Sequence, residues 1–328
     1  MHPKYLLKLI LLASAVVAIN AQAQVSSKIQ IGVSPTSPIP DQEVRLQVTS
    51  ASFDLSRSVI TWIKDGKTVL KGLGETAYFF NAGKLGSKTA VEAQAETPDG
   101  LIFKTSKTIT VADAILVWSA FTTVPTLYPG KALASANSLV RVTAIPFLPL
   151  SAGSFDTKSG LSFTWYLDDE IKGSRSGFGK DFFEFRTALT PGSEASVRVK
   201  IENRAKSLSV EKVITIPIQP TQVHLYLSHP VSGANLGKAY ESLSLRSGEE
   251  KRFSAQPFYF DSTKSSTLKT RWLLDNESLP SPPQQENVII FKTPQVEEEI
   301  TRKITVIFTN ARNIYQETRK DFLASIKP

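Results

Sequence analysis

The stretch SFTWYLDDE (162–170) has two counterparts in the chain, VITWIKDGK (59–67) and KTRWLLDNE (269–277). Each copy places an Asp three residues after a Trp and follows that Asp with Gly, Asp or Asn. The Trp residues of the three copies stand 103 and 107 residues apart. A local pattern repeated at a nearly constant period indicates a tandem array of three similar domains.

Each repeat also contains a segment in which apolar and polar residues alternate. These segments are AVEAQAET (90–97), SVRVKIEN (196–203) and ITVIFTNA (304–311). Alternation with period two predicts β-strands, and the 19 Pro and 17 Gly residues are typical of the turns between them. A repeat of about 100 residues is the size of an immunoglobulin-like sandwich. We therefore predict an all-β chain of three tandem immunoglobulin-like β-sandwich domains.

The N-terminal stretch MHPKYLLKLILLASAVVAINAQAQ (1–24) combines basic residues, an apolar run and the small-residue motif AQA (21–23). This order is typical of a secretory signal peptide, which we predict over residues 1–23. Lys8 interrupts the apolar run, which leaves it short for a membrane-spanning helix. The alternative is that the segment is not cleaved and stays as an N-terminal anchor. The predicted domains that follow are 25–112, 113–219 and 220–328.

Three longer stretches carry a resemblance to a known family. DLSRSVITWIKDGKTVLKGLGETAYFFNAGKLGSKT (54–89), ILVWSAFTTVPTLYPGKAL (115–133) and SGFGKDFFEF (176–185) resemble uncharacterised secreted proteins of environmental bacteria with tandem immunoglobulin-like or PKD-like (polycystic-kidney-disease-type) repeats. The resemblance covers essentially the whole mature chain and is weaker in the third copy. It implies three sandwich domains after a signal peptide, and no activity. The PKD signature Trp-Asp-Phe-Gly-Asp-Gly is absent. Of that signature, the first two copies keep only the Trp and the turn residues.

Three adjacent acids, Asp168, Asp169 and Glu170, could form a metal site, an acid/base pair or a turn. The equivalent residues KDGK (64–67) and LDNE (274–277) keep turn-forming residues and lose the acidity. Adjacent acids also lack the alternate-position spacing of a calcium loop. We interpret the stretch as a strand end followed by a two-residue hairpin turn. The Trp before each turn is predicted to be structural core: Trp62, Trp165 and Trp272.

The composition leaves few residues for chemistry. Without Cys, disulfides, thiolate catalysis, zinc–thiolate sites and iron–sulfur clusters are excluded. His224 and His229 stand near the boundary between repeats two and three, without a motif for a triad or a metal centre. We therefore predict no catalytic residue, no cofactor, no metal ligand and no enzyme activity. The full chain has a net charge of +8, and without Lys4 and Lys8 of the predicted signal peptide the mature chain carries +6. Spread over three domains, this is a mild basic bias, and we expect no nucleic-acid partner.

Aromatic residues supply the candidate binding surface. Phe147 lies in PFLPL (146–150), and Phe258 and Tyr259 lie at the equivalent place of the third repeat. Tyr128 is near the first of these in sequence. Exposed aromatic side chains can stack on sugars or anchor a protein partner. The alternative is that they close the end of a sandwich or pack at a domain junction.

The expected protein is secreted, extracellular or envelope-associated, and has a structural or adhesive role at the cell surface. Sandwich loops or a strand edge would bind a protein or a cell-envelope polysaccharide. We expect a membrane contact only through the signal segment, if it is uncleaved. One alternative is an accessory subunit of a pilus or secretion assembly. The other is an extracellular hydrolase, which would need two carboxylates in one cleft.

Overall fold

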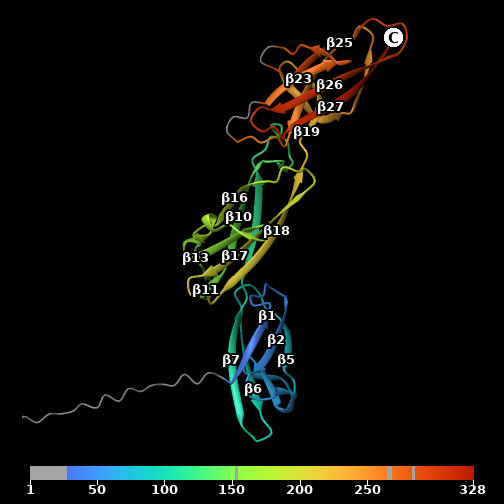
Figure 1. Ribbon diagram of the computed structural model, residues 1–328. Coiled ribbons are helices and arrows are strands. Elements are labelled where there is room, and N and C mark those ends of the chain that lie inside the picture. Colours follow the sequence, from blue (N-terminus) through green and yellow to red (C-terminus); the bar gives the residue numbers. More distant parts are fainter. Residues whose placement is uncertain (1–27, 152–153, 264–267, 283–284) are drawn as a thin grey trace, which may run out of the picture. The chain divides into compact units, whose positions relative to one another are not determined.

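The computed structural model describes residues 28–151, 154–263, 268–282 and 285–328 (Figure 1). The predicted signal peptide lies outside these residues. β-Strands dominate the described part, which confirms the all-β fold class. No helix in it is long and apolar enough to cross a membrane. The helical elements are single 3-10 turns, η1 (Leu55–Arg57), η2 (Lys158–Gly160) and η3 (Gly173–Arg175).

We use copy one, copy two and copy three for the predicted ranges 25–112, 113–219 and 220–328, and these boundaries stay a prediction. The contacts within the chain divide it into two compact units. One unit combines the described residues up to Val33 with Leu46–Tyr78 and Ala90–Lys107, and the other combines Ser34–Arg45, Phe79–Thr89 and Thr108–Pro328. Copies two and three therefore belong to the same compact unit.

Copy one contributes two sheets. The first has the order β1-β2-β5, from β1 (Ile29–Ser34), β2 (Glu43–Ser50) and β5 (Ala77–Asn81). The second has the order β4-β3-β6-β7, from β3 (Val59–Lys64), β4 (Lys67–Leu73), β6 (Lys88–Glu96) and β7 (Ile102–Thr110). Buried and more exposed residues alternate along β2 and β6, so each of these strands has one core face.

Copy two also forms two sheets. One has the order β16-β10-β8, from β8 (Asp113–Ala120), β10 (Leu139–Phe147) and β16 (Phe182–Arg186). The other has the order β14-β13-β17-β18-β9, from β9 (Ala134–Ser135), β13 (Leu161–Leu167), β14 (Glu170–Ile171), β17 (Glu194–Asn203) and β18 (Ser209–Gln219). Three short strands complete this copy: β15 (Gly177–Phe178) beside β13, and the pair β11 (Pro149–Ser151) and β12 (Ser154–Phe155).

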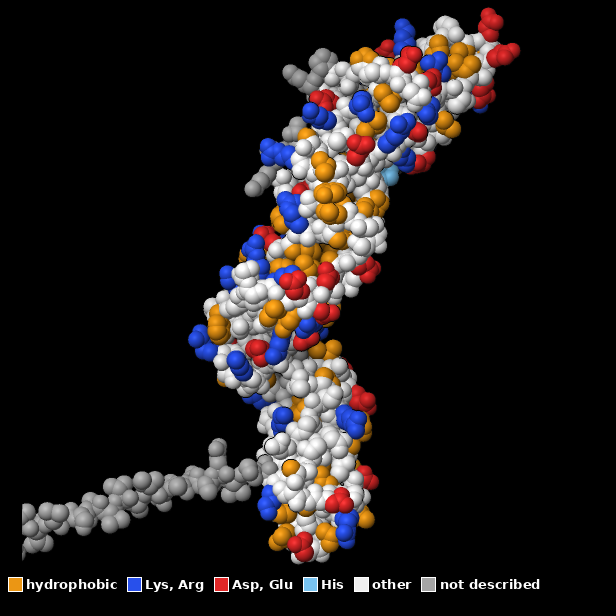
Figure 2. Space-filling view, viewed as in Figure 1, with side chains coloured by type: hydrophobic (Ala, Val, Ile, Leu, Met, Phe, Trp, Pro, Cys, Tyr) orange, Lys and Arg blue, Asp and Glu red, His pale blue; other side chains and the backbone are white. Residues whose placement is uncertain are grey.

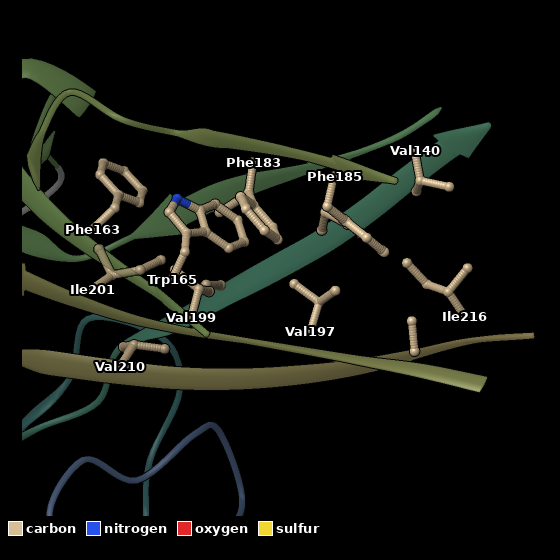
Figure 3. Packing of buried hydrophobic residues seen from close by; sticks show 14 of the residues in the cluster. Val140, Phe163, Trp165, Phe183, Phe185, Val197, Val199, Ile201, Val210 and Ile216 are labelled. Carbon is tan, nitrogen blue, oxygen red and sulfur yellow. The ribbon is translucent and has the colours of Figure 1, made fainter. Parts of the chain in front are cut away.

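The two sheets of copy two enclose a hydrophobic core (Figure 3). Phe163 and Trp165 reach into it from β13, and Phe183 reaches into it from β16. The rings of Trp165 and Phe183 stack with their centroids 5.8 Å apart. Such face-to-face burial of alternate side chains is what makes two sheets a sandwich.

Copy three repeats this arrangement around a second hydrophobic core. One sheet has the order β20-β19-β22-β25, from β19 (Gln222–His229), β20 (Gly233–Tyr240), β22 (Glu250–Phe258) and β25 (Val288–Lys292). The other has the order β21-β27-β26-β23-β24, from β21 (Ser242–Arg246), β23 (Leu268–Leu274), β24 (Glu277–Leu279), β26 (Ile300–Asn310) and β27 (Glu317–Lys327). The short strands β9 and β21 occupy equivalent places, since each pairs in parallel with the last strand of its copy.

The hairpin prediction for WYLDDE is confirmed. Tyr166 and Leu167 of β13 pair with Ile171 and Glu170 of β14, which leaves Asp168 and Asp169 as the turn. Both turn residues have positive φ, of 51° and 64°. The equivalent pairs Asp65-Gly66 and Asp275-Asn276 share this conformation, with φ of 49° and 79° and of 50° and 76°. Positive φ at both positions is the signature of the tight turn that suits a twisted hairpin.

The first Asp of each turn has a second structural role. Its carboxylate accepts a hydrogen bond from a main-chain N–H of the neighbouring strand, at 2.8–2.9 Å. The three donors are Ala90, Ser196 and Lys303, for Asp65, Asp168 and Asp275 respectively. This bond explains why the first turn position is Asp in all three copies, while the second position varies.

The three repeated Trp side chains are 0%, 0% and 1% exposed in copies one, two and three. Each indole Nε1 donates a hydrogen bond to a main-chain carbonyl 13–15 residues later in the chain, at 2.8–2.9 Å. The acceptors are Glu75, Lys180 and Glu286. The indole therefore fills the core and also fixes the segment before the next strand, because a buried N–H needs a partner.

Candidate binding surfaces

The aromatic residues of the third repeat are buried, which corrects their assignment to a binding surface and agrees with the alternative of packing at a domain junction. Phe258 and Tyr259 are 4% and 7% exposed and form a small cluster with Tyr226. Val124 and Leu133 of copy two pack against this cluster. The two aromatic side chains thus lie at the contact between copies two and three. Burial of their apolar rings stabilises this contact and leaves them inaccessible to a binding partner. The imidazole of His224 packs edge-on against Phe258, and its pKa is lowered by burial and by nearby Lys320.

The other two candidate aromatics are more accessible. Tyr128 is 36% exposed, with its ring 5.2 Å from that of Phe258 in an edge-on contact. Phe147 is half-buried at the end of β10, and its ring lies 6.0 Å from that of Phe155, which is 43% exposed. The structure therefore separates the four residues: three gather at one junction, and Phe147 belongs elsewhere on copy two.

Main-chain hydrogen bonds join copies two and three directly. Thr122 and Asp261 form an isolated antiparallel bridge. Beside it, the N–H of Thr123 donates to the carbonyl of Phe260, and the N–H of Tyr259 donates to the carbonyl of Thr123, both at 2.7 Å. The segment after β8 therefore pairs with the segment after β22 as a short piece of β-ladder.

A buried side-chain network lies next to this bridge. Gln316, which is 0% exposed, donates from Nε2 to the Ser135 hydroxyl and to the Ala136 carbonyl, both at 2.9 Å. Its Oε1 accepts from the N–H of Asp261 at 2.8 Å and from Asn310 Nδ2 at 2.9 Å. One amide of copy three thus satisfies groups of both copies in a site shielded from water, where an unpaired polar group would be costly.

An ion pair closes the same junction. Arg186 Nη1 of copy two donates to Asp261 Oδ2 of copy three and to the Asn137 carbonyl, both at 2.7 Å. The Asp261 side chain is 8% exposed, so this pair is more protected than a surface ion pair. A hollow of about 280 Å³ lies beside it, lined by polar residues such as Asn310 and Asn313.

Tyr259 has an unusual main-chain conformation at this junction, with φ of 67°. Aromatic residues rarely adopt the left-handed region, and they do so where surrounding contacts impose it. Here the Tyr259 carbonyl accepts from the Ser135 hydroxyl, and its N–H donates to Thr123. Burial, together with a hydrogen bond to Tyr128, raises the pKa of the Tyr259 phenol to about 12.

The acidic and histidine residues do not converge into a chemical site. Among the described residues no group of three or more His, Asp or Glu could hold a metal ion. The side chain of Asp169 is 93% exposed, and it lies 3.5 Å from Arg198. The side chain of Glu170 is 76% exposed and pairs with Lys172. The WYLDDE acids therefore serve the turn and its solvated surface. In Figure 2, basic and acidic side chains lie interspersed over the visible described surface.

A larger hollow lies on copy three, with a volume of about 790 Å³. Seven consecutive residues, Lys238–Ser244, line one side of it. Its floor is the outward face of β27 and β26, with Leu323, Ser325 and Thr301. We call this hollow the β21 groove, because Ser242, Leu243 and Ser244 of β21 line it.

Sequence reasoning did not find the residues that make the junction or the groove. Gln316 and Asn313 occupy a polar turn, NARNIYQE (310–317), that reads as an ordinary loop. The one available signal was the recurrence of Gly-Lys-Ala at 130–132 and 237–239, ahead of the equivalent strands β9 and β21. The first of these segments leads into β9, which lies at the contact between copies two and three, and the second contributes to the lining of the β21 groove.

No family model matches the sequence, and no curated protein matches it. Solved structures with similar arrangements include fibronectin(III)-like modules of Clostridium thermocellum CbhA, with 13% identity and a TM-score of 0.30 over 58% of this chain and 94% of that one. The central fibronectin-III array of RIM-binding protein gives 10% identity and 0.31 over 90% and 95%. Three N-terminal domains of the bacteriophage RB49 outer capsid protein Hoc give 12% identity and 0.26 over 92% and 98%.

Proposed function

We propose that this chain is a secreted, non-enzymatic protein of the cell surface or envelope, with a structural or adhesive role. The observation that carries the proposal is the contact between copies two and three. A β-bridge, the buried amide of Gln316 and the Arg186–Asp261 ion pair join the two sandwiches. Domains joined by a flexible linker would not need buried polar bonds of this kind.

A joined pair of sandwiches suits a protein that holds a binding surface at a set position. Sandwich domains commonly bind through loops or through an exposed strand edge, and their cores only support these surfaces. The proposed partner is a protein or an envelope polysaccharide. Basic and acidic side chains are interspersed on the face shown in Figure 2, so this face favours neither a uniformly anionic nor a uniformly cationic partner.

The test is a retention assay with the mature protein, residues 24–328. Immobilised protein is incubated with envelope fractions and purified polysaccharides from the source organism, and bound material is eluted and identified. Specific retention of one protein or one polysaccharide supports the proposal. An absence of retention by every fraction, or turnover of a glycan or peptide substrate during the incubation, contradicts it. The variant Tyr128→Ala tests whether the accessible aromatic residue near the junction contributes to binding.

A further inference from the structure

We propose that copy three binds a small amphipathic carboxylate, an alkyl chain with one carboxylate end, in a hollow at one end of its sandwich. The hollow has a volume of about 750 Å³, which is in the range of small-molecule sites. We call it the end hollow. The inference goes beyond the structural or adhesive role and does not depend on it.

The end hollow lies at the end of copy three that is remote from copy two. β22 ends at the junction with Phe258, so its first residue, Glu250, marks the opposite end of the sandwich. There the segment 293–299 crosses from β25 to β26, and so from one sheet to the other. Pro294 and Gln295 of this crossing segment line the hollow.

The floor of the end hollow is apolar. Phe291 of β25 belongs to the core of copy three and is 3% exposed. Leu274 of β23 packs against the same core from the other sheet. Both residues line the hollow, which therefore reaches between the two sheets to the end of the core. An alkyl chain placed there loses its contact with water, which favours binding.

A basic side chain lies above this apolar floor. Arg302 lines the hollow and stands two residues from Ile300 and from Ile304, which both pack in the core. Alternate residues of a strand share a face, so the Arg302 side chain lies on the core side of β26. Lys292 is a second basic lining residue, and no acid lines the hollow in the part of the chain that the structure describes. The charge of the lining therefore favours an anion.

The position of Arg302 holds a small buried residue in the other two copies. Three residues are equivalent because each donates its N–H to the first Asp of its hairpin turn: Ala90, Ser196 and Lys303. The residues before them are Thr89, Ala195 and Arg302. Thr89 and Ala195 are 8% and 4% exposed. The sandwich itself therefore does not require a cation at this position, and copy three carries one beside a hollow.

Arg302 can bind a ligand carboxylate while it keeps its ion pair. The pair joins Arg302 Nε to a carboxylate oxygen of Asp275. A guanidinium has five N–H donors, and its Nη groups can bind another carboxylate through two parallel hydrogen bonds. The Arg302 side chain is 40% exposed, so a ligand can reach it from solvent. With its carboxylate on Arg302, an alkyl chain would extend over Phe291 and Leu274.

Hydrogen bonds hold the wall of the end hollow in place. Thr293, which is 3% exposed, donates from Oγ1 to the carbonyls of Arg246 and Glu249, at 2.6 and 3.0 Å. The N–H of Val296 donates to Ser247 Oγ at 2.9 Å. The crossing segment is thus fixed to the turn between β21 and β22. A preformed wall avoids the entropy cost of ordering a loop when the ligand binds.

The probe is octanoate below its micelle concentration, and hexanoate, octanol and octylammonium are its controls. Binding to the protein, residues 24–328, is followed by NMR at the main-chain amides of three lining residues, Gly248, Gln295 and Arg302. We expect octanoate to shift these signals and to bind at least about tenfold more tightly than octylammonium, because two cations line the hollow. Each CH₂ added between hexanoate and octanoate should tighten binding about fourfold. Octanol should bind about tenfold more weakly than octanoate.

A matched set of variants tests the role of the guanidinium. Arg302→Met keeps an apolar side chain and removes the charge. We expect it to weaken octanoate binding about tenfold and to change octanol binding less than about twofold. Arg302→Lys restores a charge and should recover part of the octanoate affinity. Arg271→Met is the control, because Arg271 is exposed on the neighbouring strand β23, and its octanoate binding should stay within about twofold of wild type. Thermal unfolding shows whether each variant is folded.

Two kinds of result overturn the inference. One is that octanoate leaves the three amide signals unshifted or binds no more tightly than octylammonium. The other is that Arg302→Met, or Arg302→Lys if the Met variant is unfolded, binds octanoate as the Arg271→Met control does. An acetylated peptide that ends in Leu with a free carboxylate is the alternative occupant. If this peptide binds more tightly than octanoate, the hollow recognises a chain end of a protein and the assignment to an alkyl carboxylate is wrong. The retention assay tests the proposed function separately from all of these measurements.

Discussion

Gln316→Met is the sharpest test of the contact between copies two and three. The substitution keeps nearly the same length and volume and removes the amide. Two groups then lose an acceptor in a buried site, the N–H of Asp261 and the Nδ2 of Asn310. An unsatisfied buried donor costs about 1–3 kcal/mol, so the two donors together predict a loss of unfolding free energy of about 2–6 kcal/mol. The Ser135 hydroxyl keeps its bond to Tyr259, which limits the loss.

The assay is urea and thermal unfolding of residues 24–328, followed by Trp fluorescence and by calorimetry. We expect copies two and three of the wild type to unfold in one transition, and Gln316→Met to separate it into two. Gln94→Met is the matched control, because it removes a single partly exposed bond to Glu92. The control should change stability by less than about 0.5 kcal/mol. A Gln316→Met profile as close to wild type as the control profile would refute the reasoning about the junction.

The other predictions concern the core, the turn and the phenol. Trp272→Ala should destabilise its own sandwich by about 3–5 kcal/mol, measured by urea unfolding, and an unchanged midpoint would contradict its core role. Asp168→Ala should cost about 1–2 kcal/mol through the lost bond to the next strand, whereas Asp169→Gly should be neutral or stabilising at its positive φ. Added Ca²⁺ should shift neither melting temperature nor spectrum. Because the folded pKa of Tyr259 is about 12, above the usual value, stability should fall as pH rises above about 10. Tyr259→Phe should reduce that slope in unfolding measured between pH 9 and 12, and the part that remains is expected from Tyr226, whose pKa is also raised by burial.

The hairpins and the buried Trp residues were predictable because they depend on local chemistry. A positive φ at two successive positions selects Asp, Asn or Gly, and these residues stand in the sequence at WYLDDE and its counterparts. The burial of Trp165 follows from its place on an alternating strand of a sandwich. The repeated pattern then supplied the same interpretation for all three copies.

For the aromatic residues the sequence left two alternatives open, a binding surface or packing at a domain junction, and the structure places Phe258 and Tyr259 in the second. Phe258 and Tyr259 resemble exposed loop aromatics in the sequence. In the structure they are covered by residues of copy three and also by Val124 and Leu133, which are more than 100 residues away in the chain. A one-dimensional pattern does not record which loop of one domain meets the next domain.

The sequence by itself determined the all-β class, the threefold repeat, the tight turns and the core Trp residues, since all of these follow from spacing and side-chain type. The tertiary structure alone decided that Gln316 is a buried link between copies two and three and that β21 stands at the end of its sheet in the described part of the chain. Both properties depend on which segments distant in the chain become neighbours. Polar residues such as Ser135 and Gln316 become structurally important only when those neighbours bury them. A hydrogen bond is stronger, and an unpaired polar group more costly, where water is excluded.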